Sequence, residues 1–199
     1  MIRLLVVGDG ERDAATIPRL VEQVLNTTVA ESFRPWARLH SGGRGYSRKL
    51  KYAARQAQLA RMNGLVADVD RDRSHPGERL REMRLGRQQD RNSQPPFPTA
   101  LGEAIPHGEA WLLDDSQAVR EVLQLEPDVQ IPTPTKTKNP KQALEDNVEK
   151  SNSTQDPRTI WAEIAKALVP NRCVHAKETG FHAFAEEVKV EFGPLAEDP

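Results

Sequence analysis

The beginning of the chain is the feature that most constrains its fold. Residues 2–7 read Ile-Arg-Leu-Leu-Val-Val, a short and nearly all-apolar run, and a Gly-Asp-Gly turn at residues 8–10 ends it. Such a run is typical of a strand that is covered on both faces, as in a parallel sheet. After the turn, apolar residues recur at helical spacing, at Ile17, Leu20, Val21, Val24 and Leu25. A strand, a tight turn and a helix form half of a βαβ unit.

The alternation of strand and helix continues for about 125 residues. We expect further strands over residues 36–39, 65–67 and 100–105, with helices after them. The sequence therefore predicts an α/β fold over residues 1–125, with a mostly parallel sheet of about four strands flanked by helices. Residues 126–199 are predicted to form a loop-rich and helical C-terminal extension that packs on this domain.

Composition excludes several classes of protein. The 199 residues have a net charge of -1, so any attraction to nucleic acid must come from local clusters of charge. The single cysteine, Cys173, cannot form an internal disulfide. No apolar run reaches the roughly 18–20 residues of a membrane span, and the apolar run at the start is too short for a signal peptide. We therefore expect a cytoplasmic protein without a membrane partner.

The strongest chemical signal is the spacing Asp68-x-Asp70-x-Asp72 at the end of the third predicted strand. Residues two apart on a strand point to the same face, so these carboxylates converge. Like charges so close persist when a cation neutralises them, and Mg²⁺ prefers oxygen ligands. The alternative is a solvated acidic loop in which Arg71 and Arg73 pair with the acids locally.

The first strand-to-helix turn carries Asp9, Glu11 and Asp13. In a parallel sheet this turn lies on the same edge as Asp68, so Asp9 and Glu11 are candidate metal ligands. Asp13 is expected mainly to cap the helix. Glu109, which follows the fourth predicted strand, is a further candidate ligand at this edge.

Residues 32–67 contain several arginines and lysines and no acid. Within this stretch, Arg44 lies in a glycine-rich loop, and Arg48 and Lys49 open the next predicted helix. Backbone amides, a helix N-terminus and cations together suit a phosphate, so these residues are candidates for binding a nucleic-acid backbone. The alternative is a solvated basic face.

Three of these motifs together resemble a known family. They are Val-Val-Gly-Asp-Gly-Glu at residues 6–11, Asp-x-Asp-x-Asp at residues 68–72 and Glu-Ala-Trp-Leu-Leu-Asp-Asp at residues 109–115. The combination is similar to the TOPRIM-like family of bacterial proteins and to the nuclease domain of the overcoming-lysogenization-defect (OLD) nucleases, over about residues 1–125. The family pattern Glu-Gly-x-x-Glu is matched by Gly8 and Glu11, whereas Val7 stands at the first glutamate.

The resemblance implies a TOPRIM-like sheet, a Mg²⁺ or Mn²⁺ site and phosphodiester hydrolysis, often with an ABC-type ATPase as partner and in bacterial defence. Our leading hypothesis is a metal-dependent nuclease that acts on nucleic acid, DNA more than RNA, with a homo-oligomer as one candidate assembly. Its catalytic residues would be Glu11, Asp68 and Asp70, with Asp9, Asp72 and Glu109 as further ligands. The alternative is a catalytically weak TOPRIM-shaped module that binds an ATPase, because Val7 replaces an acid.

Overall fold

Four parallel strands form a single sheet in the computed structural model, which describes residues 1–40, 45–91, 96–151 and 153–197. The strand order is β2-β1-β3-β4, so β1 and β3 lie in the middle. The strands are β1 (Ile2–Gly8), β2 (Val29–Pro35), β3 (Gly64–Asp70) and β4 (Thr99–Ala104). The predicted α/β class and the parallel sheet of four strands are confirmed.

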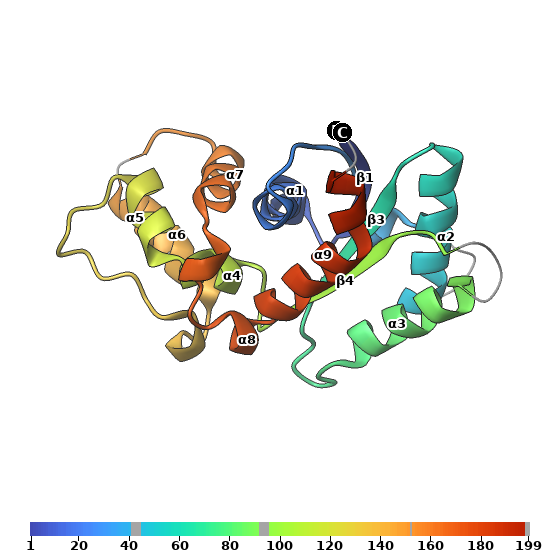
Figure 1. Ribbon diagram of the computed structural model, residues 1–199. Helices are drawn as coiled ribbons and strands as arrows, with labels where there is room; N and C mark the ends of the chain where they lie inside the picture. Colours follow the sequence, from blue (N-terminus) through green and yellow to red (C-terminus); the bar gives the residue numbers. More distant parts are fainter. Residues whose placement is uncertain (41–44, 92–95, 152, 198–199) are drawn as a thin grey trace.

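Helices cover both faces of this sheet (Figure 1). Helices α2 and α3 pack on one face, and α1 and α9 pack on the other, next to a lobe of helices α4 to α7. The helices are α1 (Glu11–Leu25), α2 (Tyr46–Leu59), α3 (Glu78–Arg91), α4 (Glu109–Asp114), α5 (Ser116–Leu123), α6 (Pro140–Lys150), α7 (Pro157–Ala167), α8 (Ala176–Thr179) and α9 (Phe181–Glu197), with short 3₁₀ turns at Trp36–Arg38, Pro134–Lys136 and Pro170–Arg172. No helix in the described ranges is both long enough and apolar enough to span a bilayer.

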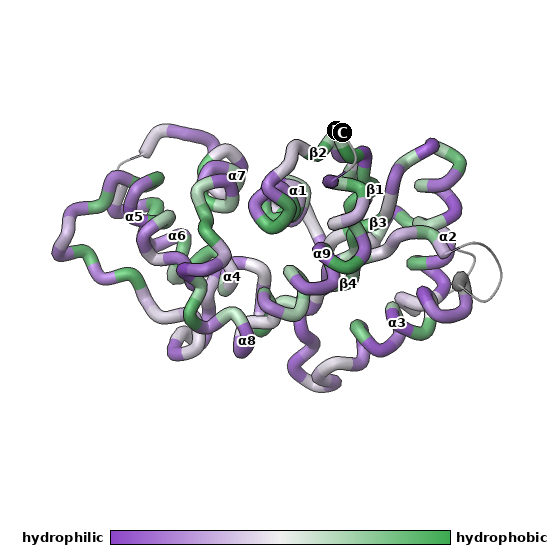
Figure 2. Tube along the Cα trace, viewed as in Figure 1, coloured by the Kyte–Doolittle hydropathy of each residue, from purple (hydrophilic) through white to green (hydrophobic). Residues whose placement is uncertain are grey.

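Strand β1 is apolar on both sides because each side meets a separate layer of helices (Figure 2). Leu4 and Val6 pack toward α1, and Leu5 and Val7 pack toward α2. All four side chains are at most 5% exposed. The continuous apolar run thus has the physical cause that the sequence indicates.

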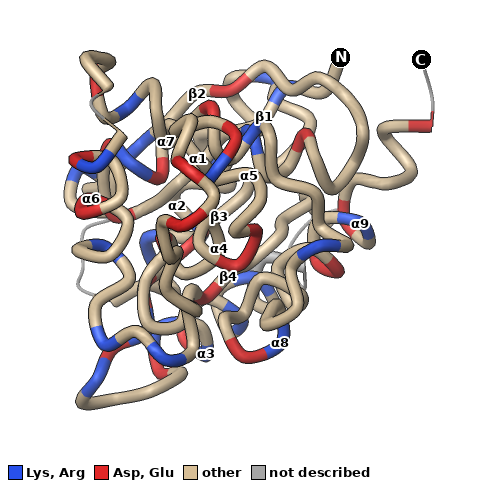
Figure 3. The backbone as a smooth tube through the Cα atoms, turned by 90° about the vertical axis from the view of Figure 1, so that its left-hand side faces the viewer, with Lys and Arg blue, Asp and Glu red and all other residues tan. Residues whose placement is uncertain are grey.

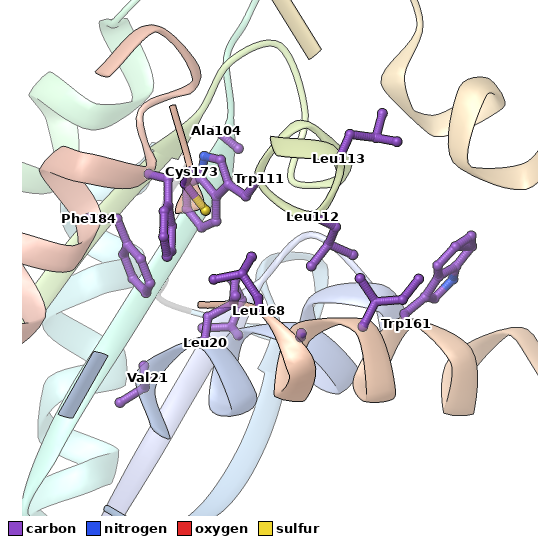
Figure 4. Close-up of a cluster of buried hydrophobic side chains, with 14 of the residues drawn as sticks. Leu20, Val21, Ala104, Trp111, Leu112, Leu113, Trp161, Leu168, Cys173 and Phe184 are labelled. Atoms are coloured by element: carbon purple, nitrogen blue, oxygen red, sulfur yellow. The ribbon is translucent and has the colours of Figure 1, made fainter. Parts of the chain in front are cut away.

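The C-terminal extension shares a core with the α/β part of the chain (Figure 4). Trp111 on α4 stacks on Phe184 of α9, with ring centroids 4.9 Å apart, and its indole N–H donates to the Thr179 carbonyl at 2.7 Å. Trp161 of α7 belongs to the same apolar cluster. Helices on both sides of residue 125 are therefore held by one set of buried side chains.

The expected strand at residues 36–39 is wrong, and the second strand lies at Val29–Pro35 instead. Strand β2 is at the edge of the sheet and half-exposed, so it carries polar residues such as Glu31 and Arg34 and has no continuous apolar run. Trp36 and Leu39 are buried, but they belong to a 3₁₀ turn whose apolar side chains pack beside α2.

Candidate functional site

The first strand-to-helix turn holds Asp13 against the end of β1. The Asp13 Oδ2 atom accepts hydrogen bonds from the backbone N–H of Asp9 at 2.6 Å and of Gly10 at 3.1 Å. A side chain at Gly8 would not fit, because its Cβ would lie 2.6 Å from the Asp13 Cβ. The glycine therefore allows an acid at the third helical position to approach the sheet.

Strand β3 places Asp68 and Asp70 on the same face of the sheet, at its carboxyl edge. Asp68 is 1% exposed, and its Oδ1 atom has no hydrogen-bond partner among the described residues. Space for this oxygen exists because the neighbouring residue on β4 is Gly102, whose Cβ would lie 2.7 Å from it. An unpaired carboxylate in this position is costly unless it carries a proton or meets a cation.

Asp70 lies nearer the surface and is held by the loop after β4. Its Oδ1 accepts from the Gly108 N–H at 3.1 Å, and its Oδ2 lies 3.0 Å from Nδ1 of His107. Its own backbone N–H donates to Asp9 Oδ2 at 3.3 Å. The loops after β1, β3 and β4 therefore meet at this point.

Asp9, Asp13, Asp68 and Asp70 form what we call the acidic cluster. Burial, followed by the charges of Asp13, Asp70 and Asp9, raises the pKa of Asp68 well above its ordinary value. Burial also raises the pKa of Asp13 to about 7, with the charges of Asp70 and Asp9 adding to the effect and backbone N–H groups opposing it. Burial raises the pKa of Asp70 despite the opposing His107. The cluster thus holds more negative charge than its surroundings neutralise.

A cleft of about 460 Å³ opens over the acidic cluster. One side is acidic, and the other side comes from helices α6 and α7 of the extension. In Figure 3, acidic segments lie near the labels α1, β3 and α4, with basic segments close to them. Lining residues from the two sides include Asp9, Asp13, Asp70, His107, Lys141 and Trp161.

Glu11 lies at the rim of the cleft and not in the cluster. Its side chain is 72% exposed and forms an ion pair with Arg158 of α7. Glu109 also lines the cleft, where it pairs with Arg12. Neither carboxylate is directed at Asp68 by a contact in the structure.

Asp72 stands apart from Asp68 and Asp70, because β3 ends at Asp70 and the two-residue alternation stops there. Backbone N–H groups of His75 and Ser74, at 3.0 and 2.8 Å from Asp72 Oδ1, lower the pKa of Asp72. Arg79 pairs with its other oxygen at 3.1 Å. Asp72 therefore caps the following turn.

Arg48 and Lys49, two of the predicted phosphate-binding residues, do not line this cleft. Lys49 donates to the Trp36 carbonyl at 2.9 Å, and Arg48 is exposed on the first turn of α2. Arg44 lies outside the described residues.

Asp13, which the sequence predicts mainly as a helix cap, also belongs to the acidic cluster, and His107, which is not among the predicted site residues, contacts Asp70. Asp13 lies four and seven residues before Ile17 and Leu20, so it continues the buried stripe of α1, whereas Glu11 does not. The turn also reads Asp9-Gly10-Glu11-Arg12-Asp13, an acid-Gly-x-x-acid spacing two residues beyond the Gly8 register. For His107, a lone histidine after a strand, the sequence offers no comparable signal.

The donor chemistry of the acidic cluster suits a hard divalent cation. Four carboxylates lie close enough there for the charges of Asp9, Asp13 and Asp70 to raise the pKa of Asp68, and one buried oxygen lacks a partner among the residues described. In the part of the chain that the structure describes, no three His, Cys, Asp or Glu side chains are already placed as ligands around one point. Backbone N–H groups and His107 occupy several of the oxygens that a cation would use.

Comparison with known proteins adds no relative to this description. No protein-family model, no curated protein and no solved structure matches the chain. Its function is therefore argued from the acidic cluster and the cleft.

Proposed function

We propose that the chain is a Mg²⁺- or Mn²⁺-dependent phosphodiester hydrolase that acts on nucleic acid in the cytoplasm, DNA more than RNA. The observation that carries this proposal is the acidic cluster, with the partnerless Asp68 oxygen, at the carboxyl edge of a parallel sheet. In open α/β sheets this edge is where ligands bind. The TOPRIM-like resemblance adds an ABC-type ATPase partner and a role in bacterial defence to the proposal.

Asp9, Asp13 and Asp70 would hold the cation, with Asp68 beneath them. A bound cation would neutralise charge on the phosphate and lower the pKa of a water molecule. His107 and Gly108 fix the orientation of the Asp70 carboxylate through its two oxygens. The cleft wall from α6 and α7 would limit how much water surrounds a bound phosphate.

The test is Mn²⁺ binding by calorimetry, together with nicking of plasmid and cleavage of single strands. We expect the double variant Asp13→Asn, Asp70→Asn to lose both Mn²⁺ binding and the cleavage of nucleic acid. The matched control is Asp72→Asn, which removes a carboxylate two residues from Asp70 that caps a turn, pairs with Arg79 and does not line the cleft. Equal binding and cleavage in the double variant and in wild type would refute the proposal.

A second candidate is the catalytically weak module that binds an ATPase. The observation in its favour is that no three ligands are preassembled among the described residues. It predicts no Mn²⁺ binding by wild type and copurification with the ATPase, and the double variant would keep that interaction.

A further inference from the structure

One basic side chain in the cleft has no role in the proposed metal chemistry. Lys141, the second residue of α6, lines the cleft opposite the acidic cluster, and its side chain is exposed. None of the residues described pairs with its ammonium group. It thus differs from the other cations around the cleft.

Arg12 is already fully engaged. Its Nη1 atom bonds Glu109, its Nη2 atom lies 2.6 Å from Glu145, and its guanidinium stacks over Trp161 with 5.2 Å to the ring centroid. Arg158 pairs with Glu11 at the rim. A new anion would have to displace carboxylates from these arginines, whereas Lys141 is free to bind it.

The balance of charge in the cleft limits the kind of anion that can enter. Among the described residues that line it are five acids, Asp9, Glu11, Asp13, Asp70 and Glu109, and two basic side chains, Arg12 and Lys141. Asp9, Glu11 and Glu109 have arginine partners, whereas Asp13 and Asp70 have no lysine or arginine partner among the residues described. A long duplex presents two closely spaced rows of phosphates, which such a lining repels. A substrate with few phosphates is repelled less and can enter together with a divalent cation.

The size of the cleft points the same way. Its volume of about 460 Å³ lies within the range of ~300–1,000 Å³ that is typical of small-ligand sites. A stiff duplex, with a persistence length of about 50 nm, bends into a recess less readily than a flexible single strand does. Here Asp68, at the base of the acidic cluster, is only 1% exposed.

We propose that the cleft binds a phosphodiester carried by unpaired nucleotides, with the phosphate between the acidic cluster and Lys141. This inference rests on the proposed hydrolase function. The sources of such a phosphodiester are a single strand of DNA or RNA, or a free dinucleotide. The C-terminal extension then supplies the substrate-binding half of the site.

The test compares Lys141→Ala with Lys150→Ala, a lysine at the far end of the same helix that does not line the cleft. Binding of a fluorescein-labelled 12-nucleotide single strand is measured by anisotropy with Ca²⁺ in place of Mg²⁺. We expect Lys141→Ala to bind at least about 10-fold more weakly than wild type, the loss of one charge-assisted hydrogen bond. Lys150→Ala should bind like wild type.

Substrate arms identify the source. A DNA strand, the RNA strand of the same sequence, a dinucleotide and the DNA duplex compete for the labelled strand, and we expect the duplex to compete at least 10-fold more weakly than the DNA strand. A duplex that competes as well as the single strand, or equal binding by the two lysine variants, overturns the inference. Because binding is measured without turnover, an inactive protein that still distinguishes Lys141→Ala would refute only the hydrolase proposal.

Discussion

Replacing Asp13 with asparagine tests whether the acidic cluster is as strained as its geometry indicates. Asparagine keeps the shape of the side chain and an oxygen that can accept from the N–H groups of Asp9 and Gly10. It removes only the charge. The start of α1 should therefore remain intact in the variant.

The magnitude follows from the pKa of Asp13, which is about 7 in the folded chain and 3.8 when unperturbed. Because the folded state holds the proton more tightly, this stabilisation is fully present below about pH 4 and is lost as the pH rises through about 7. At ~1.4 kcal/mol for each pH unit, the loss reaches ~4 kcal/mol. Asp68 titrates together with Asp13, so this figure is an upper bound for Asp13 alone.

The assay is urea unfolding at pH 5 and pH 8 in the absence of divalent cations. Between pH 5 and pH 8 we expect the free energy of unfolding to fall further in wild type than in Asp13→Asn, and the difference should be ~2 kcal/mol or more. At pH 8 the variant should be the more stable protein. The control Asp146→Asn removes a charge from exposed α6 and should follow wild type at both pH values. Parallel pH dependence in wild type and Asp13→Asn would refute the reasoning.

Three further predictions concern other parts of the structure. Gly102→Ala should lower the free energy of unfolding by ~1–3 kcal/mol, because its methyl group would lie 2.7 Å from Asp68 Oδ1, whereas Gly193→Ala, with open space around it, should be neutral or stabilising in urea titrations. Burial raises the pKa of Cys173 to about 12, so its thiol should react with a disulfide reagent at pH 8 at least ~100-fold more slowly in the folded chain than in guanidinium. Glu11→Gln should keep the calorimetric Mn²⁺ affinity of wild type within about twofold, since an exposed ion pair contributes little; a tenfold loss would contradict its place at the rim.

The central strands were predictable from the sequence because burial on both faces leaves a continuous apolar run. Strand β1 and strand β3 are of this kind. The edge strand β2 was not predictable in this way, because its half-exposed positions carry charged residues, a composition that is also typical of loops. The strand was therefore predicted at residues 36–39, around the buried Trp36, since a single apolar residue does not distinguish a strand from a 3₁₀ turn.

The sequence also predicts which edge of the sheet carries the candidate site, but it does not predict every residue of that site. Residues Glu11 and Asp13 are two positions apart on a helix, so they point in different directions and only one of them can face the sheet. The buried stripe of α1 decides in favour of Asp13. Asp72 does not lie beside Asp68 and Asp70 for a related reason, because the alternation that aligns those two residues ends where the strand ends.

Asp68 is a buried acid at a position where the fold favours an apolar side chain. Its position on a central strand, beneath aromatic side chains of α4 and α9, would suit an apolar residue, and an apolar residue there would leave no unpaired oxygen. A buried acid without a partner is a local conflict with the fold, and such conflicts concentrate at functional sites. Gly8 and Gly102 both make room for carboxylates at this same edge. Two glycines on different strands, one beside Asp13 of α1 and one beside Asp68 of β3, are hard to explain by packing alone, and they favour a site that gathers negative charge in order to bind a cation.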